Sequence, residues 1–442
     1  MVNDNAREVA LKCLLRVNSD GAYSNIVLND ILKKSKLKPL DKNFATTLFY
    51  GVLERKLTLD YIIKQYSKVK FNNITKDILE ILRIGIYQLL FMNKVPQSAS
   101  VNESVKLVKK KSAKGFVNGI LRSFIRDGCE LKYQGSNNIE ELSIKYSCPK
   151  DIINLWINAY GKDKTIEILK SLFGRPELIA RVNNLKIDIN DLKKIFIKEN
   201  IKVSDVNEVK NALLLENTGT IEELDSFKKG YFHIQDLSSQ ICCICLSPKK
   251  GEKVMDVCAA PGGKTFNLAE TMENNGQILA FDLYDEKVKL IRQGANRLGI
   301  NIINVDKRDS FKAGEKYFNF ADKVLCDVPC SGLGIIRRKP EIRYKKISDI
   351  CDLPSLQYRI LEQSSKYLKK SGVLVYSTCT LNPYENGKVA DKFLMNHKEF
   401  KPYDINLPSF ITRNTFEPSN QLTLFPGNYG NDGFFIAAFI RK

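Results

Sequence analysis

Apolar side chains recur every three or four residues along much of the first 128 residues, a spacing typical of helices that bury one face. One such series begins at Ala6, a second includes Phe44, and a third, strongly apolar series begins at Asp77. Pro96 is predicted to end the helical series before it, and the next helix is predicted to begin at Val101. The pattern predicts an all-helical N-terminal domain over residues 1–128.

The pattern becomes irregular after this helical region. Residues 129–147 are polar and contain the turn-forming run GSNN, which predicts a linker. Short helical and strand-like segments then alternate up to residue 229. Helices are predicted near 152–160, 165–173 and 189–199, and strands near 179–183 and 212–215. We interpret residues 148–229 as a small α/β adaptor domain.

Residues 230–442 alternate apolar strands with amphipathic helices, which predicts a doubly wound, mainly parallel sheet. Strands are predicted at 253–257, 277–282, 302–305, 323–327 and 373–377. The closing run GFFIAAFIRK predicts an antiparallel strand at the edge of this sheet.

The stretch VMDVCAAPGGKT, Val254–Thr265, joins a buried strand to a helix through a glycine turn. Such a turn brings free backbone N–H groups close to a ligand. A phosphate-binding loop is one alternative, but Cys258 stands where its first glycine belongs, and the dinucleotide pattern G-x-G-x-x-G is absent. We predict a small nucleotide-like cofactor. Its contacts are Cys258, Ala259, Ala260, Pro261, Gly262, Gly263 and Lys264.

Three acidic residues follow successive predicted strands, at the edge that carries the glycine turn. Asp282 closes the second strand, where a carboxylate can accept hydrogen bonds from ribose hydroxyls. Asp309 follows the third strand and could meet an adenine amino group, and Asp327 ends the fourth. A single such Asp is usually a helix cap, but three together favour a nucleoside ligand without a triphosphate. S-adenosylmethionine fits this description.

Two cysteines lie just beyond predicted strands on the same edge: Cys330 in CDVPCSG and Cys379 in YSTCTLNP. A thiol reacts as its thiolate, and a positive loop or Lys264 could favour that form. A single cysteine would more often be core packing. Two at adjacent ligand-facing strand ends favour covalent chemistry, although the residues alone do not rank them.

The formal net charge of +19 indicates a polyanionic partner, nucleic acid before a membrane surface. A general lysine bias in the source is the alternative. The charge is clustered, however, with seven basic residues against Glu103 between residues 103 and 126. They are Lys106, Lys109, Lys110, Lys111, Lys114, Arg122 and Arg126. Beside the apolar run FVNGILRSFI they predict a helix with one packed face and one positive face.

At 442 residues the chain should hold about two to four domains. No apolar run reaches the roughly 18 residues of a membrane span, and the charged start shows no signal peptide. An odd count of 11 cysteines without paired CxxC motifs argues against disulfides and against a zinc site. We expect a cytoplasmic, monomeric protein that needs no metal.

Motifs along the chain resemble two known families. DKNFATTLFYGVL, ILEILRIGIYQLLF, VPQSASVNESVKLVKK and GFVNGILRSF, in this order, resemble the helical RNA-binding domain of the NusB family. DVCAAPGGKT, FDLY, DVPCSGLG, YSTCTLNPYEN and the terminal DGFF resemble the RNA cytosine-5 methyltransferases, with Val328 where that family usually has alanine. The resemblance implies a multidomain fold: NusB-like helices, an α/β adaptor and a Rossmann-like, S-adenosylmethionine-dependent methyltransferase domain over 230–442.

The resemblance also implies a reaction, methylation of a cytosine of 16S ribosomal RNA at C5. It assigns the attack on C6 to Cys379 and the release step to Cys330, and Asp327 suits a role at N3 of the base. Addition of a thiolate to C6 makes C5 able to take a methyl group. The target must be single-stranded or flipped out of a helix to expose C6.

The segment Ile335–Lys346, IIRRKPEIRYKK, carries six basic residues against Glu341. Its position after Cys330 predicts that it holds phosphates near the target base, although an exposed loop is the simpler alternative. Other functions remain open at this point. They are methylation of another RNA such as tRNA, a non-catalytic RNA-binding scaffold, and nucleotide hydrolysis.

Overall fold

The structure, a computed structural model, describes residues 5–135, 137–206, 209–414, 417–427 and 430–442. It divides into two compact units. The helical unit comprises residues 1–173 and 336–347, and the sheet unit comprises 174–335 and 348–442. Each is described by itself.

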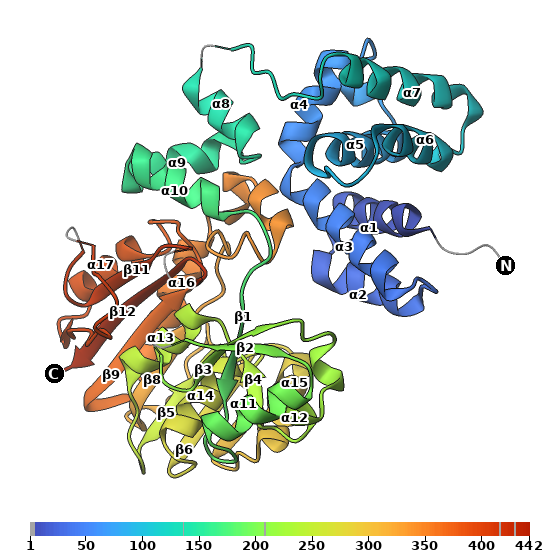
Figure 1. Cartoon of the computed structure of the whole chain (residues 1–442). Helices are drawn as coiled ribbons and strands as arrows, with labels where there is room; N and C mark the ends of the chain where they lie inside the picture. Colours follow the sequence, from blue (N-terminus) through green and yellow to red (C-terminus); the bar gives the residue numbers. More distant parts are fainter. Residues whose placement is uncertain (1–4, 136, 207–208, 415–416, 428–429) are drawn as a thin grey trace. The chain divides into compact units, whose positions relative to one another are not determined.

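The helical unit is built almost entirely of α-helices (Figure 1). In chain order these are α1 (Ala6–Asp20), α2 (Ser24–Lys34), α3 (Pro39–Glu54), α4 (Lys56–Tyr66), α5 (Lys76–Phe91), α6 (Gln97–Leu107), α7 (Lys111–Arg126), α8 (Asn138–Lys145), α9 (Lys150–Tyr160) and α10 (Lys162–Ser171). Single 3-10 turns lie at η1 (Phe71–Asn73) and η4 (Pro340–Tyr344). Helix α5 packs against α1, α3, α4, α6 and α7. The predicted helical N-terminal region is confirmed, whereas the predicted linker 129–147 contains helix α8.

Helix α5 lies at the centre of this unit because it has buried residues on all of its sides. Its buried residues include Ile78, Ile81, Leu82, Ile84 and Ile86, so apolar side chains surround the helix instead of marking one stripe. Helix α7 differs, because Val117, Ile120, Leu121 and Phe124 bury a single face. Its other face is left to water and carries the basic residues.

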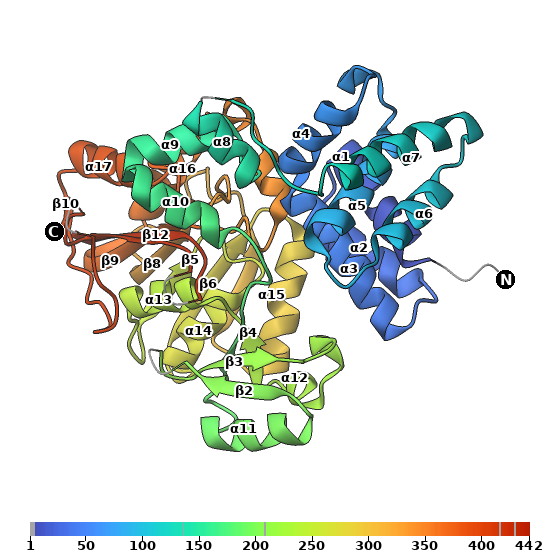
Figure 2. The same cartoon turned by 45° about the horizontal axis from the view of Figure 1, so that its top comes forward.

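The first part of the sheet unit is a four-stranded antiparallel sheet with the order β2-β3-β1-β4 among the described residues. Its elements are β1 (Leu178–Val182), α11 (Ile189–Lys198), β2 (Lys202–Asp205), β3 (Ala212–Glu216), η2 (Ile221–Glu223), α12 (Asp225–Lys228) and β4 (Phe232–Ile234). The order βαββαβ with β1 in the interior is the ferredoxin-like arrangement. Figure 2 shows α11 and α12 beside these strands.

The larger sheet contains eight described strands with the order β10-β12-β9-β8-β5-β6-β7, and β11 pairs with β12. Its elements are α13 (Leu237–Leu246), β5 (Lys253–Asp256), α14 (Gly263–Thr271), β6 (Gln277–Asp282), α15 (Asp285–Leu298), β7 (Ile303–Lys307), η3 (Glu315–Tyr317), β8 (Ala321–Asp327), η5 (Ile347–Ile350), α16 (Leu353–Ser365), β9 (Leu368–Thr378), α17 (Gly387–Asn396), β10 (Phe400–Pro402), β11 (Gln421–Leu424) and β12 (Phe434–Arg441). Strands β5 to β9 are parallel to their neighbours among themselves. The predicted doubly wound sheet is confirmed.

Helices cover both faces of this sheet (Figure 2). Alternate strand residues belong to two different cores. Val254 and Ile278 join the core formed with α13, α14 and α15, whereas Met255 and Leu279 join the core formed with α16 and α17. Burial on both faces explains why these strands are continuously apolar.

The prediction of an edge position for the C-terminal strand is wrong. Strand β12 is antiparallel, but it pairs with β9 on one side and with β10 and β11 on the other. Edge strands usually carry charge or proline that blocks further pairing. The uninterrupted run FFIAAFI therefore fits an interior strand better than an edge.

The strand order reverses next to β5. From β5 the chain first builds outward through β6 and β7, then returns to place β8 on the other side of β5. Ligands of doubly wound folds bind at the carboxyl ends of the strands at such a reversal. Strands β5 and β8 end there at Asp256 and Asp327.

Candidate active site

The glycine turn follows β5 and opens into α14. Gly262 has φ of 108°, and a Cβ there would lie 2.3 Å from the ring of Phe266, so only glycine fits. The N–H of Ala259 donates to Phe281 O at 2.8 Å, which holds the turn against β6. No side chain caps the first turn of α14, so its leading backbone N–H groups face the site.

Asp282 lies at the end of β6, directly beside the glycine turn. Its carboxylate accepts hydrogen bonds from the N–H groups of Ala260 and Tyr284, both at 3.3 Å. Lys287 Nζ lies 3.6 Å from Oδ1. Two long bonds leave acceptor capacity on a carboxylate, which can take up to about four. Asp282 can therefore accept further hydrogen bonds from a ligand.

Asp309 follows β7 and is partly used by its own loop. Its Oδ1 accepts a hydrogen bond from the N–H of Phe311 at 3.1 Å, a local turn of the kind that Asp commonly makes. Lys312 Nζ lies 3.9 Å from Oδ2. The contact with an adenine amino group remains a prediction.

Asp327 and Lys264 form an ion pair at the strand reversal. Lys264 Nζ donates to Oδ2 of Asp327 at 2.7 Å, and Ser377 Oγ on β9 donates to Oδ1 at 2.8 Å. Burial favours a lower pKa for Lys264, but the charge of Asp327 and their hydrogen bond outweigh it, so the pKa of Lys264 is raised. The lysine is thus a permanent cation that is already committed to a carboxylate.

This pairing bears on the phosphate-loop alternative. The lysine of such a loop must reach phosphate oxygens, whereas Lys264 points at Asp327. Asp282 lies on the same edge of the sheet and adds negative charge, and Asp256, whose pKa burial raises to about 7, adds only part of another. An edge that carries several carboxylates suits a nucleoside with free hydroxyls and a positively charged group better than a triphosphate.

The two predicted cysteines lie next to each other. Cys330 Sγ, three residues beyond β8, is 3.1 Å from Cys379 Sγ, the first residue after β9. The pKa of Cys330 lies well above its ordinary value, because of its hydrogen bond with Cys379, its burial and the neighbouring charges of Cys379, Glu385 and Asp327. Because a hydrogen bond joins the two thiols, one can lose its proton while the other keeps it, so the two cysteines can act at different steps of a reaction.

Two glycines bring the cysteine segments together. The N–H of Gly334 donates to Cys379 O at 3.0 Å, and the N–H of Gly433 donates to Gly334 O at 2.9 Å. A Cβ on Gly334 would lie 2.0 Å from Gly433 O. The close backbone contact explains glycine in both DVPCSGLG and the terminal DGFF.

Two buried acidic residues of this region, Asp256 and Glu385, were not among the predicted site residues. Asp256 is 1% exposed and accepts a hydrogen bond from Thr265 Oγ1 at 2.7 Å, and burial raises its pKa to about 7. Glu385 is fully buried and contacts both cysteine segments. The position of an acidic residue within an apolar strand could have identified Asp256 as a site residue. The polar run NPYEN was the corresponding signal for Glu385.

The basic segment after Cys330 uses one of its six basic residues, Arg343, for packing instead of for phosphate binding. Residues 336–347 belong to the helical unit. Arg343 is fully buried there and donates to the carbonyl oxygens of Glu54 and, at 3.0 Å, Leu172. Tyr344 OH donates to Leu53 O at 2.6 Å. Arg343 therefore anchors the segment and has no guanidinium N–H exposed for a phosphate.

The helical unit carries a positive surface on α6 and α7. The seven basic residues predicted for it, Lys106, Lys109, Lys110, Lys111, Lys114, Arg122 and Arg126, are all exposed. Several lie at the N-terminus of α7, where positive charge is unfavourable to the helix dipole. Gly115 and Gly119 have no neighbouring atom within 4 Å of an added Cβ. Packing explains neither the basic residues at the start of α7 nor the two glycines. An anion that approaches this face of the helix would explain both.

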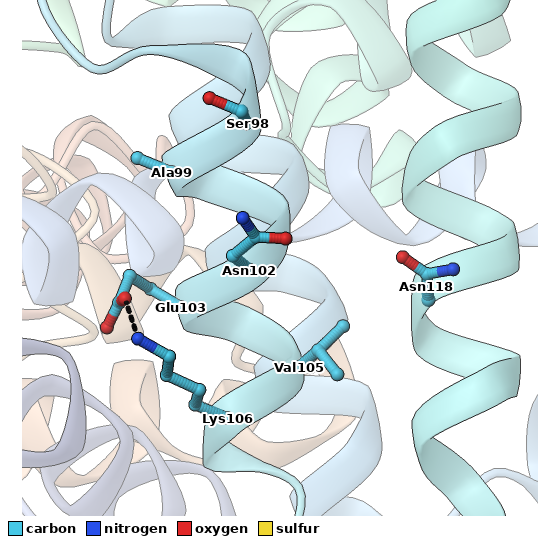
Figure 3. Close-up of a pocket in the computed structure, with 7 residues that line it drawn as sticks. All are labelled: Ser98, Ala99, Asn102, Glu103, Val105, Lys106 and Asn118. Atoms are coloured by element: carbon cyan, nitrogen blue, oxygen red, sulfur yellow. Dashed lines mark hydrogen bonds and ion pairs between the residues drawn. The ribbon is translucent and has the colours of Figure 1, made fainter.

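A shallow pocket of about 520 Å³ lies between α6 and α7 (Figure 3). Its lining residues are Ser98, Ala99, Asn102, Glu103, Val105, Lys106 and Asn118. Asn102 and Asn118 point toward each other across it. Arg122 Nε donates to Asn118 Oδ1 at 2.9 Å. The surface thus combines positive charge with two side-chain amides.

The described part of the chain contains no group of three or more His, Cys, Asp or Glu side chains arranged to hold a metal ion. Within the same residues, none of the helices has both the length and the apolar character of a membrane span.

Comparison with known families covers most of the chain. A family model described as 16S rRNA methyltransferase RsmB/F matches residues 243–440. The NusB family matches residues 4–126, and a ferredoxin-like domain of RsmF/B-like methyltransferases matches 148–222. The chain is 36% identical to the "Probable ribosomal RNA small subunit methyltransferase B" of Bacillus subtilis strain 168, with 100% of both chains covered.

Solved structures show the same architecture. The crystal structure of PH0851 is similar with a TM-score of 0.83, 26% identity and 100% of both chains covered. A methyltransferase homolog from Pyrococcus horikoshii has a TM-score of 0.61 and 29% identity, and the match covers 70% of this chain and all of that one. NusB-like helices, a ferredoxin-like domain and a Rossmann-like methyltransferase domain are therefore confirmed as the fold class. The predicted boundaries at residues 128, 148 and 229–230 stay predictions.

Proposed function

This chain belongs to the RsmB/F family of 16S rRNA methyltransferases, and on that premise we propose that it methylates C5 of a cytosine through a covalent cysteine adduct. The observation that carries the proposal is the pair of thiols, 3.1 Å apart, beyond β8 and β9. Cytosine C5 alone is a poor nucleophile, and a thiolate added to C6 corrects this. A non-catalytic scaffold would have no use for such a pair.

The cysteines divide the reaction between them. The thiolate of Cys379 adds to C6, which makes C5 nucleophilic, and C5 takes the methyl group. Cys330, once deprotonated, removes the proton from C5. The electrons of that C–H bond form the C5–C6 double bond, the C6–S bond breaks, and Cys379 leaves as a thiolate. Both thiols are restored with no net oxidation.

Asp327 makes the first step easier. Lys264 and Ser377 hold its carboxylate in place through hydrogen bonds of 2.7 and 2.8 Å. Paired with a lysine, it acts as an acceptor and stabilises a proton on N3 of the cytosine. A protonated N3 withdraws electrons from C6 and favours attack by the thiolate of Cys379.

S-adenosylmethionine, when bound, would supply an electrophilic methyl group and would leave as the neutral thioether S-adenosylhomocysteine. The turn Cys258–Gly263 would hold it with backbone N–H groups, and Asp282 would accept from the ribose hydroxyls. Asp309 would receive the adenine amino group. The family and the acidic rim both support this assignment.

A methyl-transfer assay tests the function directly. The full-length protein and labelled S-adenosylmethionine should methylate 16S rRNA from cells that lack the enzyme, and digestion should yield 5-methylcytosine. Labelling of tRNA alone would favour the other RNA substrate. Label in a base other than cytosine, or at a position other than C5, would contradict the proposed chemistry.

Replacement of Asp282 tests the cofactor site. Asp282→Ala should weaken S-adenosylmethionine binding by about 1.5–3 kcal/mol, because charged hydrogen bonds to the ribose are lost. Isothermal calorimetry would record this as roughly a 10- to 150-fold higher Kd. Asp285→Ala is the matched control, since its carboxylate is 66% exposed and pairs with Lys307. Equal affinities for the wild type and Asp282→Ala would remove Asp282 from the site.

Charge reversal tests the RNA-binding surface. Changing Lys109, Lys110 and Lys111 to Glu should weaken RNA binding and flatten its salt dependence, because fewer counterions are released. Affinity for S-adenosylmethionine should not change. Lys68, Lys70 and Lys76, also exposed on the helical unit, form a control triple with the same change in net charge. If both triples reduce RNA affinity equally, net charge and not the α6–α7 surface is responsible.

A further inference from the structure

Glu385 lies where the two cysteine segments meet and is 0% exposed. From the Cys330 segment it accepts hydrogen bonds from Ser331 N at 2.8 Å and from Ser331 Oγ at 2.5 Å. From the Cys379 segment it accepts one from Asn382 Nδ2 at 2.9 Å. One carboxylate thus joins the residue after Cys330 to the loop that begins at Cys379.

A third element holds the same carboxylate. Gln357 on α16 donates from Nε2 to Glu385 Oε2 at 2.8 Å and to Pro329 O at 2.9 Å. Tyr376 OH on β9 donates to the backbone oxygen of Glu385 at 2.6 Å. Pro329 precedes Cys330, so both neighbours of that cysteine in the chain are held by this network.

The charge of Glu385 has no cationic partner among the ion pairs of the described residues. A buried carboxylate is costly unless several donors stabilise its charged form. Here two amide side chains, one hydroxyl and one backbone N–H supply that stabilisation. A neutral side chain could fill the same space without this cost, so the charge itself calls for a function.

We propose, resting on the covalent mechanism above, that Glu385 is a positioning residue that sets the two thiols against each other and keeps the proton on Cys330 until Cys379 has reacted. Its hydrogen bonds fix the backbone on both sides of the thiol pair. Its negative charge opposes a second negative charge on Cys330. The nucleophile is thereby restricted to Cys379.

The charges around Cys330 agree with this order of events. Its pKa is raised first by the hydrogen bond with Cys379, then by burial, and then by the charges of Cys379, Glu385 and Asp327. Lys264 is bound to Asp327 at 2.7 Å and offsets the charge of that carboxylate. When Cys379 becomes bonded to C6, its charge and its hydrogen bond disappear. The pKa of Cys330 then falls, and Cys330 can lose its proton to solvent and serve as the base.

Thiol alkylation measures the proton on each cysteine without any RNA. The folded full-length protein is treated with a limiting amount of iodoacetamide across a pH series, and peptide mass spectrometry follows Cys330 and Cys379 separately in molecules that carry a single modification. In the wild type, Cys379 should react at lower pH than Cys330. In Glu385→Gln the Cys330 profile should move down by about one pH unit or more, the scale of a nearby charge. Glu385→Asp, which keeps the charge, should stay closer to the wild type.

Two controls guard the interpretation. Cys351 is exposed and its profile should be the same in every variant. Gln357→Lys places a cation beside Glu385 while keeping a donor there, so it should lower the Cys330 profile even if Glu385→Gln fails to fold. Unchanged Cys330 profiles in folded Glu385→Gln and in Gln357→Lys would overturn the proposal.

The outcome is separable from that of the proposed function. If no RNA is methylated but the Cys330 profile shifts, the positioning role stands and the reaction was wrongly assigned. If methylation occurs and the profile does not shift, the reaction stands and Glu385 is only structural. A purely structural role would lower the melting temperature of Glu385→Gln without moving the Cys330 profile.

Discussion

Cys379→Ser is expected to abolish both methyl transfer and any covalent RNA adduct. A hydroxyl is far less ionised than a thiol near neutral pH, so attack on C6 stops at the first step. The rate should fall by roughly 10⁴-fold or more, the scale on which removal of a covalent nucleophile acts. Single-turnover assays with labelled S-adenosylmethionine measure the rate, and denaturing gels detect the adduct.

Cys330→Ala should fail at a later step. Attack and methyl transfer still occur, but no base removes the proton from C5 and the C6–S bond persists. A protein–RNA adduct that depends on S-adenosylmethionine should accumulate and should be absent from the double mutant. An adduct in Cys379→Ser and none in Cys330→Ala would mean that Cys330 attacks C6 and that Cys379 removes the proton from C5. Normal turnover without adduct in both variants would exclude the covalent mechanism.

Cys351→Ser is the control for this pair. The thiol is exposed, lies outside both cysteine segments and should leave rate and adduct unchanged. In the adduct, burial and the charges of Glu385 and Asp327 still raise the pKa of Cys330, which adds a pH dependence to release. Turnover that requires deprotonated Cys330 should rise with pH more steeply than adduct formation does, because only the release step needs that thiolate.

The parts of the site that the sequence predicted are those written in short local motifs. The turn around Gly262 and Gly263, the acid at Asp282 and the thiols of Cys330 and Cys379 each follow a predicted strand. Parallel strands bring their carboxyl ends to one edge. Local strand prediction was therefore enough to place these residues together, and the distance of 3.1 Å between the thiols agrees with it.

The role of Glu385 was hidden because its partners are distant in sequence. Its hydrogen bonds reach Ser331, 54 positions away, and Gln357, 28 positions away. No periodicity reports such contacts. The interior place of β12 was hidden for a similar reason, since β10 and β11 have only three and four residues and leave no clear alternation.

The basic segment 336–347 shows how charge alone misleads. Its composition suggested six groups for phosphates, yet Arg343 bonds carbonyl oxygens 171 and 289 positions away in the chain. The planar guanidinium presents several donors in fixed directions, which suits a cluster of helix-end carbonyls. Only the fold reveals that these carbonyls converge there. Phosphate binding by the other basic residues of the segment stays a prediction.

Arg343→Ala is accordingly expected to destabilise the helical unit and not merely to weaken RNA binding. The change leaves the carbonyls of Glu54 and Leu172 buried without donors and opens a cavity, at a cost of about 3 kcal/mol or more. Arg343→Lys should recover only part of this, because one ammonium cannot reach the same set of carbonyls. Hydrogen exchange of the amides in α3 and α10 would locate and measure the loss.

Lys346→Ala separates structure from RNA contact within the same segment. Its side chain is exposed, so the change should alter stability by less than about 0.5 kcal/mol. Any loss of RNA affinity in this variant would come from the missing charge, with a smaller salt slope. If instead Arg343→Ala keeps wild-type exchange rates in α3 and α10 but loses RNA affinity, Arg343 reaches phosphate after all. The buried geometry described for it would then not be the one that binds RNA.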